Sequence, residues 1–337
     1  MHPVEALERI GYLLERAREP TYRVRAFRGA AAALEGMSED EIRERATANS
    51  LRQLPGVGPK TEQVIREALA GETPSYLKKL LHDQPEEGEG LDRGDPLRAA
   101  LKGDCHTHSD WSDGGSPVDV MAAAARDLGH DYMVLTDHSP RLTVAKGLSP
   151  ERLRSQLQLL EKLNKQLAPF RILKGIEVDI NEDGSLDQEP ELLDQLDVVV
   201  ASVHSKLRME EKEMTARMLK AVANPRVNIL GHCTGRLVVG RGRPESTFDA
   251  DAVFSACAEH GTAVEINSRP ERLDPPKRLL KLAVEKGCKI AIDTDAHAPG
   301  QLEWQVYGCA RAVDCEVPVE SIVNAWEADE LAAWASS

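Results

Sequence analysis

The stretch DYMVLTDH, residues 131–138, contains the unit from which most of the chain is built. It is a short run of apolar and β-branched residues, typical of a buried strand, followed by a polar turn. Six more such runs occur, roughly at residues 101–106, 171–178, 197–203, 227–231, 262–267 and 289–294. Segments with apolar residues at helical spacing separate them, at 118–128, 150–167, 212–223, 250–260 and 277–286. This alternation predicts an α/β protein with a parallel sheet, and seven repeats favour a TIM-like (β/α)7 barrel.

Histidines and carboxylates gather at the ends of these runs. Six of the ten histidines lie at or just after the C-terminal end of a predicted strand: His106, His108, His138, His204, His232 and His297. Asp113, Glu177 and Asp295 occupy similar places. Because the C-terminal strand ends of a β/α barrel meet at one rim, these side chains are expected to lie together. Imidazole and carboxylate ligands suit Zn, Mn or Fe, so the pattern predicts a metal site; buried polar residues that tie loops together are the alternative.

The first 82 residues have a different pattern. Apolar residues recur at helical spacing through residues 4–18, 22–34, 40–48, 61–70 and 75–81, which predicts a small all-α domain over residues 1–82. The segment that follows is rich in Gly, Pro and acidic residues, and we interpret residues 83–96 as a linker. The barrel then occupies residues 97–337.

The sequence LPGVGPKTEQVIREAL, residues 54–69, predicts a helix-hairpin-helix in the first domain. Gly56, Val57 and Gly58 would form the hairpin, whose backbone N–H groups and following helix N-terminus can meet a DNA phosphate, and Lys60 would add charge. A plain helical hairpin is the alternative. Upstream, Arg23, Arg25 and Arg28 surround Phe27 and form a candidate DNA-binding patch.

Net charge does not exclude a phosphate-bearing substrate. The formal charge is −14, but residues 1–82 carry 13 Lys and Arg against 12 Asp and Glu. Some acids elsewhere would be metal ligands, and bound cations reverse the local sign of such a site. No apolar run is long enough to cross a bilayer and there is no signal-peptide pattern, so a cytoplasmic protein without membrane association is expected.

The strand-end motifs resemble the PHP (polymerase and histidinol phosphatase) domain. HTHSDWSDG (106–114), LTDH (135–138), GIEVDI (175–180), SVHS (202–205), ILGHCTGR (229–236) and DTDAH (293–297) follow in the order typical of that family, with closest similarity to the PHP domain of bacterial family X DNA polymerases. The resemblance implies a distorted (β/α)7 barrel and up to three divalent metal ions, with Mn or Zn favoured and Fe allowed.

The same resemblance implies a ligand set. It assigns His106, His108, Glu177 and Asp295 to a first metal, Asp113, His138 and His297 to a second, and His204 and His232 to a third, which Glu177 bridges to the first. Arg236, four residues beyond His232, is the candidate catalytic residue because guanidinium groups bind phosphate oxygens in a bidentate way; Arg269 is a second candidate.

Residues 4–81 resemble the 8-kDa domain of family X polymerases, which grips gapped or 5′-phosphate DNA ends. Val64 stands where lyase-active relatives have a lysine, so a deoxyribose phosphate lyase activity is not expected. The polymerase palm is missing, and the linker occupies its place.

Together these features predict a metal-dependent phosphodiesterase that acts on DNA by attack of a metal-activated hydroxide on phosphorus. A 3′–5′ exonuclease, or a 3′-end or abasic-site processing enzyme of DNA repair, is favoured, with gapped, single-stranded or 3′-end DNA as substrate. Two alternatives stay open: a small-molecule phosphomonoesterase of the histidinol phosphatase type, and a non-catalytic scaffold that binds DNA ends. The sequence identifies no protein partner.

Overall fold

The computed structural model describes residues 1–82 and 91–337, which form two compact units, one on each side of the remaining segment. The first unit is all-α, as predicted. Its helices are α1 (Pro3–Arg16), α2 (Thr21–Leu34), α3 (Glu39–Thr47), α4 (Pro59–Leu69) and α5 (Ser75–His82), with a short 3-10 helix at Leu51–Gln53. Their apolar faces enclose one core that includes Leu7, Phe27, Leu34 and Ile65.

The second unit is built on seven parallel strands in chain order: β1 (Gly103–Thr107), β2 (Tyr132–Leu135), β3 (Arg171–Asp179), β4 (Val198–Ser202), β5 (Ile229–Leu230), β6 (Ala263–Asn267) and β7 (Ile290–Asp293). A parallel bridge between Thr107 and Ala296, and a hydrogen bond from the Cys105 N–H to Asp293, bring β1 beside β7. The sheet is therefore a nearly closed barrel, and the predicted fold class is confirmed.

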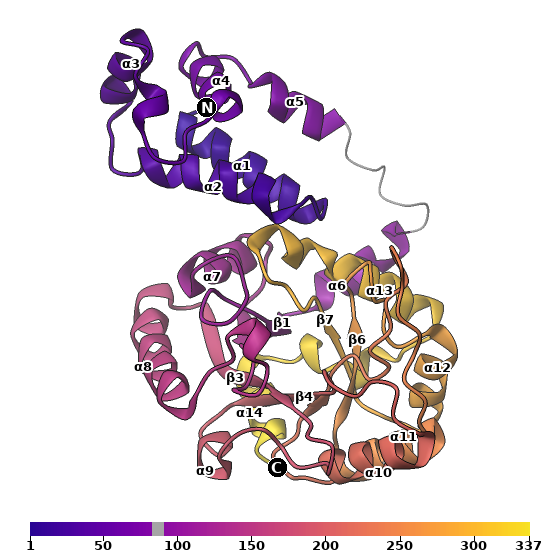
Figure 1. Ribbon diagram of the computed structural model, residues 1–337. Coiled ribbons are helices and arrows are strands. Elements are labelled where there is room, and N and C mark those ends of the chain that lie inside the picture. The colour runs from indigo at the N-terminus through magenta and orange to yellow at the C-terminus, as the bar shows by residue number, and fades with distance from the viewer. Residues whose placement is uncertain (83–90) are drawn as a thin grey trace. The chain divides into compact units, whose positions relative to one another are not determined.

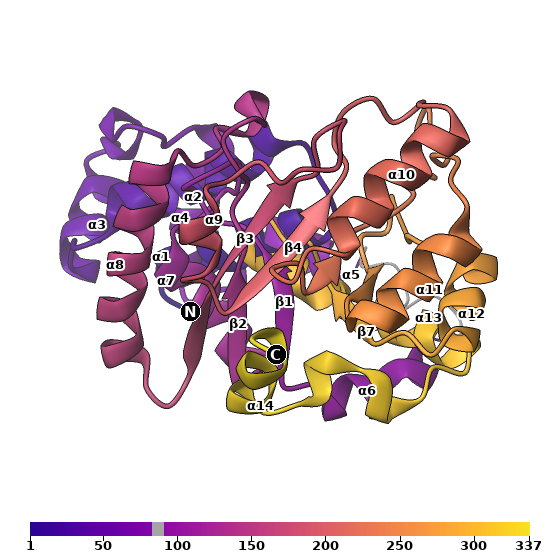
Figure 2. The same ribbon diagram turned by 90° about the horizontal axis from the view of Figure 1, so that it is seen from below.

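Helices surround the strands on the outside of this barrel (Figures 1 and 2). They are α7 (Val118–Asp127), α8 (Pro150–Leu167), α9 (Pro190–Leu193), α10 (Glu211–Val222), α11 (Ala250–His260), α12 (Lys277–Glu285) and α13 (Gln305–Asp314). Local chemistry sets their ends: α8 begins where the Ser149 hydroxyl accepts from the Arg152 N–H and Pro150 occupies the first turn. The five helices predicted between strands all form.

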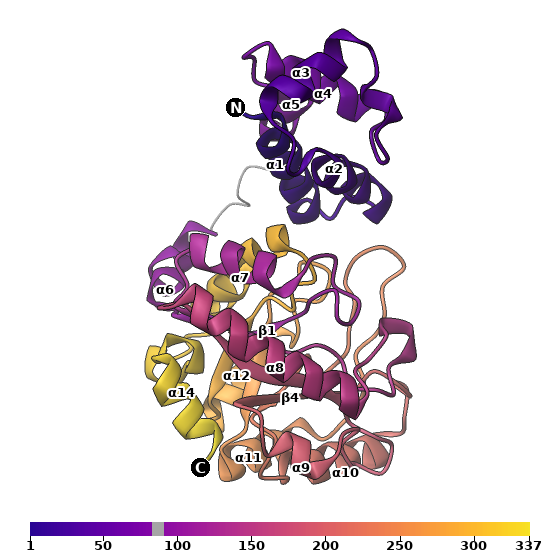
Figure 3. The ribbon, with the colours of Figure 1, turned by 90° about the vertical axis from the view of Figure 1, so that its left-hand side faces the viewer.

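Apolar side chains fill the inside of the barrel below its C-terminal rim. Residues from all seven strands form one buried cluster that includes Cys105, Tyr132, Val200 and Ala291. Leu331 of α14 (Ala328–Ala335) joins this cluster, so the last helix closes the end of the barrel opposite the rim. Figure 3 shows α14 at the left of the barrel and the long rim loops at the right. The barrel is a packed core with space for chemistry only at the rim.

The predicted linker extends too far into the barrel unit. Of residues 83–96, residues 83–90 lie outside the described part of the chain, but residues 92–94 form a 3-10 helix and α6 (Asp95–Ala100) follows. Arg93 pairs with Asp314 of α13, and a Cβ at Gly94 would lie 2.7 Å from the Ala310 nitrogen. Gly94 is thus required for close packing, although the composition of the segment around it resembles that of a linker.

Within residues 1–82 and 91–337, no helix is long and apolar enough to span a membrane.

Candidate metal centre

Strand ends bring the nine predicted ligands together at the rim. His106 lies in β1 and Glu177 in β3, while the others follow their strands within a few residues: His108 and Asp113 after β1, His138 after β2, His204 after β4, His232 after β5, and Asp295 and His297 after β7. The β1–β2 register shifts between Asp104 and Thr107. Such an irregularity re-aims a side chain, and here His106 points at the carboxylates of other strands.

Glu177 is the centre of the cluster. It is fully buried, and its Oε1 lies 2.9 Å from Nε2 of His232 and 3.2 Å from Nε2 of His204. Its Oε2 lies 2.8 Å from Nδ1 of His138 and 3.4 Å from Nε2 of His106. One carboxylate therefore contacts histidines from four strands, which is the position of a bridging ligand.

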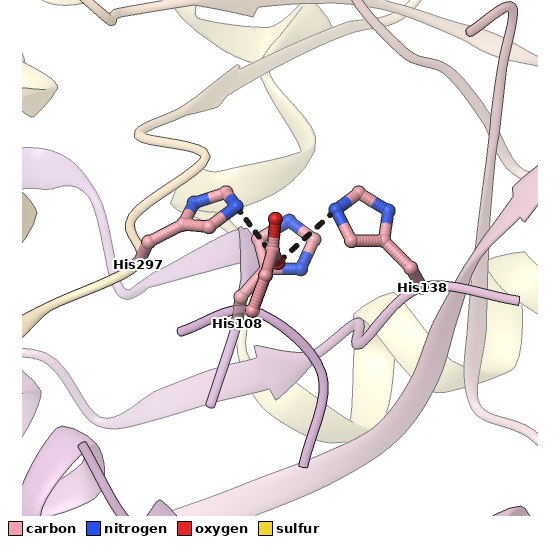
Figure 4. Close-up of side chains that lie close together, drawn as sticks. His108, His138 and His297 are labelled. Carbon is pink, nitrogen blue, oxygen red and sulfur yellow. Dashed lines mark ion pairs between the residues drawn. The ribbon is translucent and has the colours of Figure 1, made fainter. Parts of the chain in front are cut away.

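Three groups of side chains have ligand atoms close enough to share an ion. They are His108, Asp113, His138 and His297; His106, His108 and Asp295; and His138, Glu177 and His204. In the first group, Asp113 Oδ1 lies 3.4 Å from His138 Nε2 and 3.2 Å from His297 Nε2. Figure 4 shows the rings of His108, His138 and His297 turned toward one point. These groups overlap the three predicted sets, but His108 and His138 each belong to two of them.

The unsatisfied polar atoms of the cluster fit bound cations. Nε2 of His106, both ring nitrogens of His108 and Oε2 of Glu177 are buried, and none of them has a hydrogen-bond partner in suitable geometry within the described part of the chain, although charged or polar groups lie near. Buried polar atoms in proteins almost always have partners, so several orphans aimed into one place need an explanation. Divalent ions would supply the missing partners, and nitrogen with carboxylate oxygen is the donor set that Zn, Mn and Fe accept.

Two carboxylates that the sequence analysis missed orient these histidines. Glu265 Oε1 lies 2.6 Å from Nδ1 of His106, and its other oxygen accepts from the backbone N–H of His232. Asp179 Oδ1 lies 3.3 Å from Nδ1 of His204. Such partners fix which imidazole nitrogen faces a metal. The available signal was strand alternation, because Asp179 stands two residues after Glu177 and faces the same side.

The N-terminal unit forms the predicted hairpin. Gly56 has φ +85°, and a Cβ there would lie 3.0 Å from the Gly29 carbonyl, so only glycine fits this turn. Gly58 caps α4, and Lys60 is exposed beside it. Val57 differs from the prediction: its side chain is buried and its N–H donates to the Leu54 carbonyl. Val57 therefore supports the turn with its side chain, and its N–H already has a partner within the hairpin.

The comparisons with known proteins agree with this geometry. The PHP domain family matches residues 104–269, and a helix-hairpin-helix domain matches residues 1–74. A probable phosphatase of Thermoanaerobacter sp. is 32% identical over 205 residues, which cover 58% of this chain and 78% of the relative. The chain belongs to the PHP domain family of metal-dependent phosphoesterases.

A longer relative is more similar in sequence over its aligned part. The DNA polymerase/3′-5′ exonuclease PolX of Bacillus subtilis is 39% identical over 225 residues, or 67% of this chain, but the aligned part spans only 39% of that protein. A solved structure of histidinol phosphate phosphatase from Lactococcus lactis has a TM-score of 0.43 and 20% identity, over 63% of this chain and 92% of its own. A superposition score this low supports no further comparison.

Arg236, the candidate catalytic residue from the sequence, does not contact the histidine cluster within the described residues, whereas other arginines do. Arg236 donates to the carbonyl oxygens of Arg272 and Leu273, and no contact in the described part of the chain joins its side chain to the histidine cluster. Arg269 Nη1 lies 3.0 Å from His297 Nδ1, and Arg272 Nε lies 3.5 Å from a carboxylate oxygen of Asp295. The structure therefore favours Arg269 and Arg272 as the cations beside the cluster, because backbone carbonyls hold Arg236.

The carboxylates of the cluster are held ionised. Burial raises the pKa of Glu177, but the nearby His204 and His106 outweigh it and hold that pKa well below its usual value. Burial also raises the pKa of Asp295, but the charge of Arg269 and the close approach of the His108 ring outweigh it and hold that pKa well below its usual value. Two buried carboxylates that stay ionised are a strong electrostatic site for cations.

Glutamates already hold two arginines of the predicted N-terminal basic patch. Arg28 makes two hydrogen bonds to Glu15, of 3.0 and 2.9 Å, and Arg23 pairs with Glu19 at 2.6 Å. Arg25 is exposed. Because paired arginines offer less net charge to a phosphate, the patch is weaker than its sequence indicates, and Arg25 is its more available cation.

Proposed function

We propose that this protein is a metal-dependent phosphodiesterase that acts on DNA and processes strand ends in repair. The observation that carries the proposal is the cluster of nine side chains, centred on Glu177, in a chain that also contains a helix-hairpin-helix. The first feature supplies phosphoester chemistry, and the second contacts a DNA backbone without reading sequence.

We assign the nine side chains to three candidate metal positions, with His108 and His138 each also within reach of a neighbouring position. His106, His108, Glu177 and Asp295 would hold one ion, Asp113, His138 and His297 a second, and His204 and His232 with Glu177 a third. Bound divalent ions would activate water as a nucleophile near neutral pH and offset charge on the phosphate oxygens.

The residues of the chain have separate tasks around such ions. Glu265 and Asp179 hold the rings of His106 and His204 in orientation. Arg269 lies at the edge of the cluster, where its guanidinium can donate to a phosphate oxygen as negative charge develops. The buried histidines keep bulk water away, which strengthens each of these electrostatic contacts.

Two findings support DNA as the substrate and a 3′–5′ direction. The relative at 39% identity is named as a 3′-5′ exonuclease, and the hairpin presents a tight glycine turn with Lys60 exposed beside it. The alternative of a small-molecule phosphatase is supported by the relatives named as probable phosphatases, 78% of whose length aligns with this chain.

An activity panel separates these functions. The purified full-length chain, loaded with Mn²⁺ or Zn²⁺, is offered 5′-labelled single-stranded, gapped and abasic DNA and small phosphate monoesters. We expect DNA to be shortened from its 3′ end, and both chelator and His138→Ala to abolish this.

Faster turnover of monoesters than of DNA, unchanged by Lys60→Ala, would favour the phosphatase. If metal analysis finds no bound ion and the protein binds DNA without hydrolysing it, the remaining alternative is a non-catalytic scaffold that binds DNA ends.

A further inference from the structure

Three rim loops begin immediately after histidines of the cluster. Residues 139–149 follow His138, residues 205–209 follow His204, and residues 233–244 follow His232. The histidine rings are neighbours, with centroids 5.3 Å apart between His138 and His204 and 5.2 Å apart between His204 and His232. The three loops therefore rise from adjacent points beside the ligands, and Figure 3 shows the rim loops on the side of the barrel away from α14.

These three basic rim loops have a charge opposite to that of the rest of the barrel unit. Within these bounds they contain seven Lys and Arg residues and no Asp or Glu, whereas residues 96–337 as a whole carry 28 Lys and Arg against 38 Asp and Glu. Glu210 and Glu245 come immediately after the second and third loops, and Glu245 already pairs with Arg278. The seven are Arg141, Lys146, Lys206, Arg208, Arg236, Arg241 and Arg243. A local concentration of one sign on a protein of the other sign is the electrostatic mark of a binding surface.

Four of these cations are available to bind a phosphate. Lys146, Lys206, Arg208 and Arg241 are exposed, and among residues 1–82 and 91–337 no hydrogen bond or ion pair joins their side chains to another residue. The others have partners within the fold, such as Asn181 for Arg141. At least one available cation stands on each of the three loops.

The acidic loop after β3, residues 180–189, lies between the first two basic loops in strand order but does not cancel them. Asp183 pairs with a lysine of α10, and Glu189 with an arginine of α8. Asp187 accepts from the Ser139 hydroxyl and from a backbone N–H of the first basic loop. Three of the four acids in this segment are therefore already engaged, two of them by cations outside the basic rim loops.

The third loop is fixed in shape. Leu237 and Arg243 exchange two backbone hydrogen bonds of 2.9 Å. Just beyond the loop, the Ser246 hydroxyl donates to the Leu207 carbonyl of the second loop at 2.8 Å. A surface that is already ordered loses little entropy when it binds a ligand.

We propose that the basic rim loops bind the phosphates of the DNA strand on either side of the one that is cleaved. This inference rests on the proposed function. Cations spread over three loops match a polymer with regularly spaced phosphates, whereas a phosphate monoester is too small to reach beyond the histidine cluster. The loops would thus select polynucleotide over small esters and lead the strand to Glu177.

The test uses the full-length Mn²⁺ protein and a charge-matched pair of variants. Lys206→Gln with Arg208→Gln removes two available cations from the second loop. Lys162→Gln with Lys165→Gln removes two exposed lysines from α8, near the other end of the barrel. Binding of a labelled, cleavage-resistant phosphorothioate strand is measured against salt, and hydrolysis of bis-p-nitrophenyl phosphate reports on the cluster itself.

We expect the rim variant to bind the strand at least about fivefold more weakly at 0.1 M salt. Its slope of log affinity against log salt should fall in magnitude by about 1.4, the value for two lost contacts to a single strand. Hydrolysis of the small ester should be unchanged, and the α8 variant should match wild type throughout.

Equal strand affinity and salt slope in the two variants would overturn the inference. If the rim variant also loses small-ester hydrolysis, the single change Arg241→Gln on the third loop decides by the same measurements. A wild-type protein that hydrolyses the small ester but no DNA would overturn the proposed function, while the binding slopes would still decide whether the loops bind a polynucleotide.

Discussion

At the scale of single residues, Glu177 organises the site because both of its carboxylate oxygens are used. Oε1 faces His204 and His232, and Oε2 faces His106 and His138. Two other candidate ligands have uncommon backbone conformations, with φ +20° at His232 and +53° at Asp295. Positive φ at non-glycine residues costs energy and persists where the surroundings enforce it, as they do at functional sites.

Glu265 is one of the groups that enforce this geometry, since it contacts both His106 and the backbone of His232. We predict that Glu265→Gln lowers metal affinity or activity by about 10- to 100-fold, because the ligand orientation is lost. Calorimetric metal titration and bound-metal content measure the affinity part. Glu161→Gln on the surface of α8 is the matched control, and equal metal affinity in the two variants would contradict the role of Glu265.

His130 supplies a prediction outside the site. Burial, reinforced by the Arg98 charge, lowers its pKa to about 3. It is therefore neutral in the folded protein, while the unfolded chain takes up a proton near pH 6.5. The contribution of neutral His130 to the free energy of unfolding is complete above about pH 6.5. It falls as the pH drops, by roughly 2 kcal/mol at pH 5. Urea unfolding at pH 7 and pH 5 should show a smaller pH-dependent loss in His130→Gln than in wild type; equal losses would refute this assignment.

At the scale of elements, close packing rather than propensity decides where glycine is required. A Cβ at Gly103, the first residue of β1, would lie 2.3 Å from the Tyr132 ring, whereas one at Gly29 in α2 would meet nothing within 4 Å. We predict that Gly103→Ala destabilises the barrel unit by about 1–3 kcal/mol. Gly29→Ala should stabilise the N-terminal unit by up to about 1 kcal/mol, because it lies inside a helix. Denaturant unfolding with a probe in each unit checks both signs, and the same sign for both would contradict the account.

Strand and helix positions were predictable because their signals are local. The apolar runs that predict β2 and β7 end within a residue or two of the strands in the structure, and histidines at those ends converge because a barrel has one rim. The direction of a long side chain is not local: Arg236 follows a ligand in sequence, yet the carbonyl oxygens of residues 272 and 273 hold it away from the cluster. Glu265 was missed for a similar reason, since its role depends on partners in β1 and after β5.

At the scale of the whole molecule, the two compact units should respond differently to metal. The nine ligands all lie in residues 106–297, so only the barrel unit gains stability from bound ions. A ligand present at 100 times its Kd adds about 2.7 kcal/mol. We predict that chelator lowers the barrel transition in calorimetry and leaves the N-terminal transition unchanged. A shift of neither transition, or an equal shift of both, would contradict a metal site confined to the barrel.

The central claim is that the side chains around Glu177 form one multinuclear metal site. It is tested most directly by anomalous diffraction from crystals of the full chain grown with Mn²⁺. The account predicts more than one metal peak inside the histidine cluster, with at least one coordinated by a carboxylate oxygen of Glu177, and loss of that peak in Glu177→Ala. A map with no peak among these residues, or with metal bound only elsewhere on the protein, would contradict it.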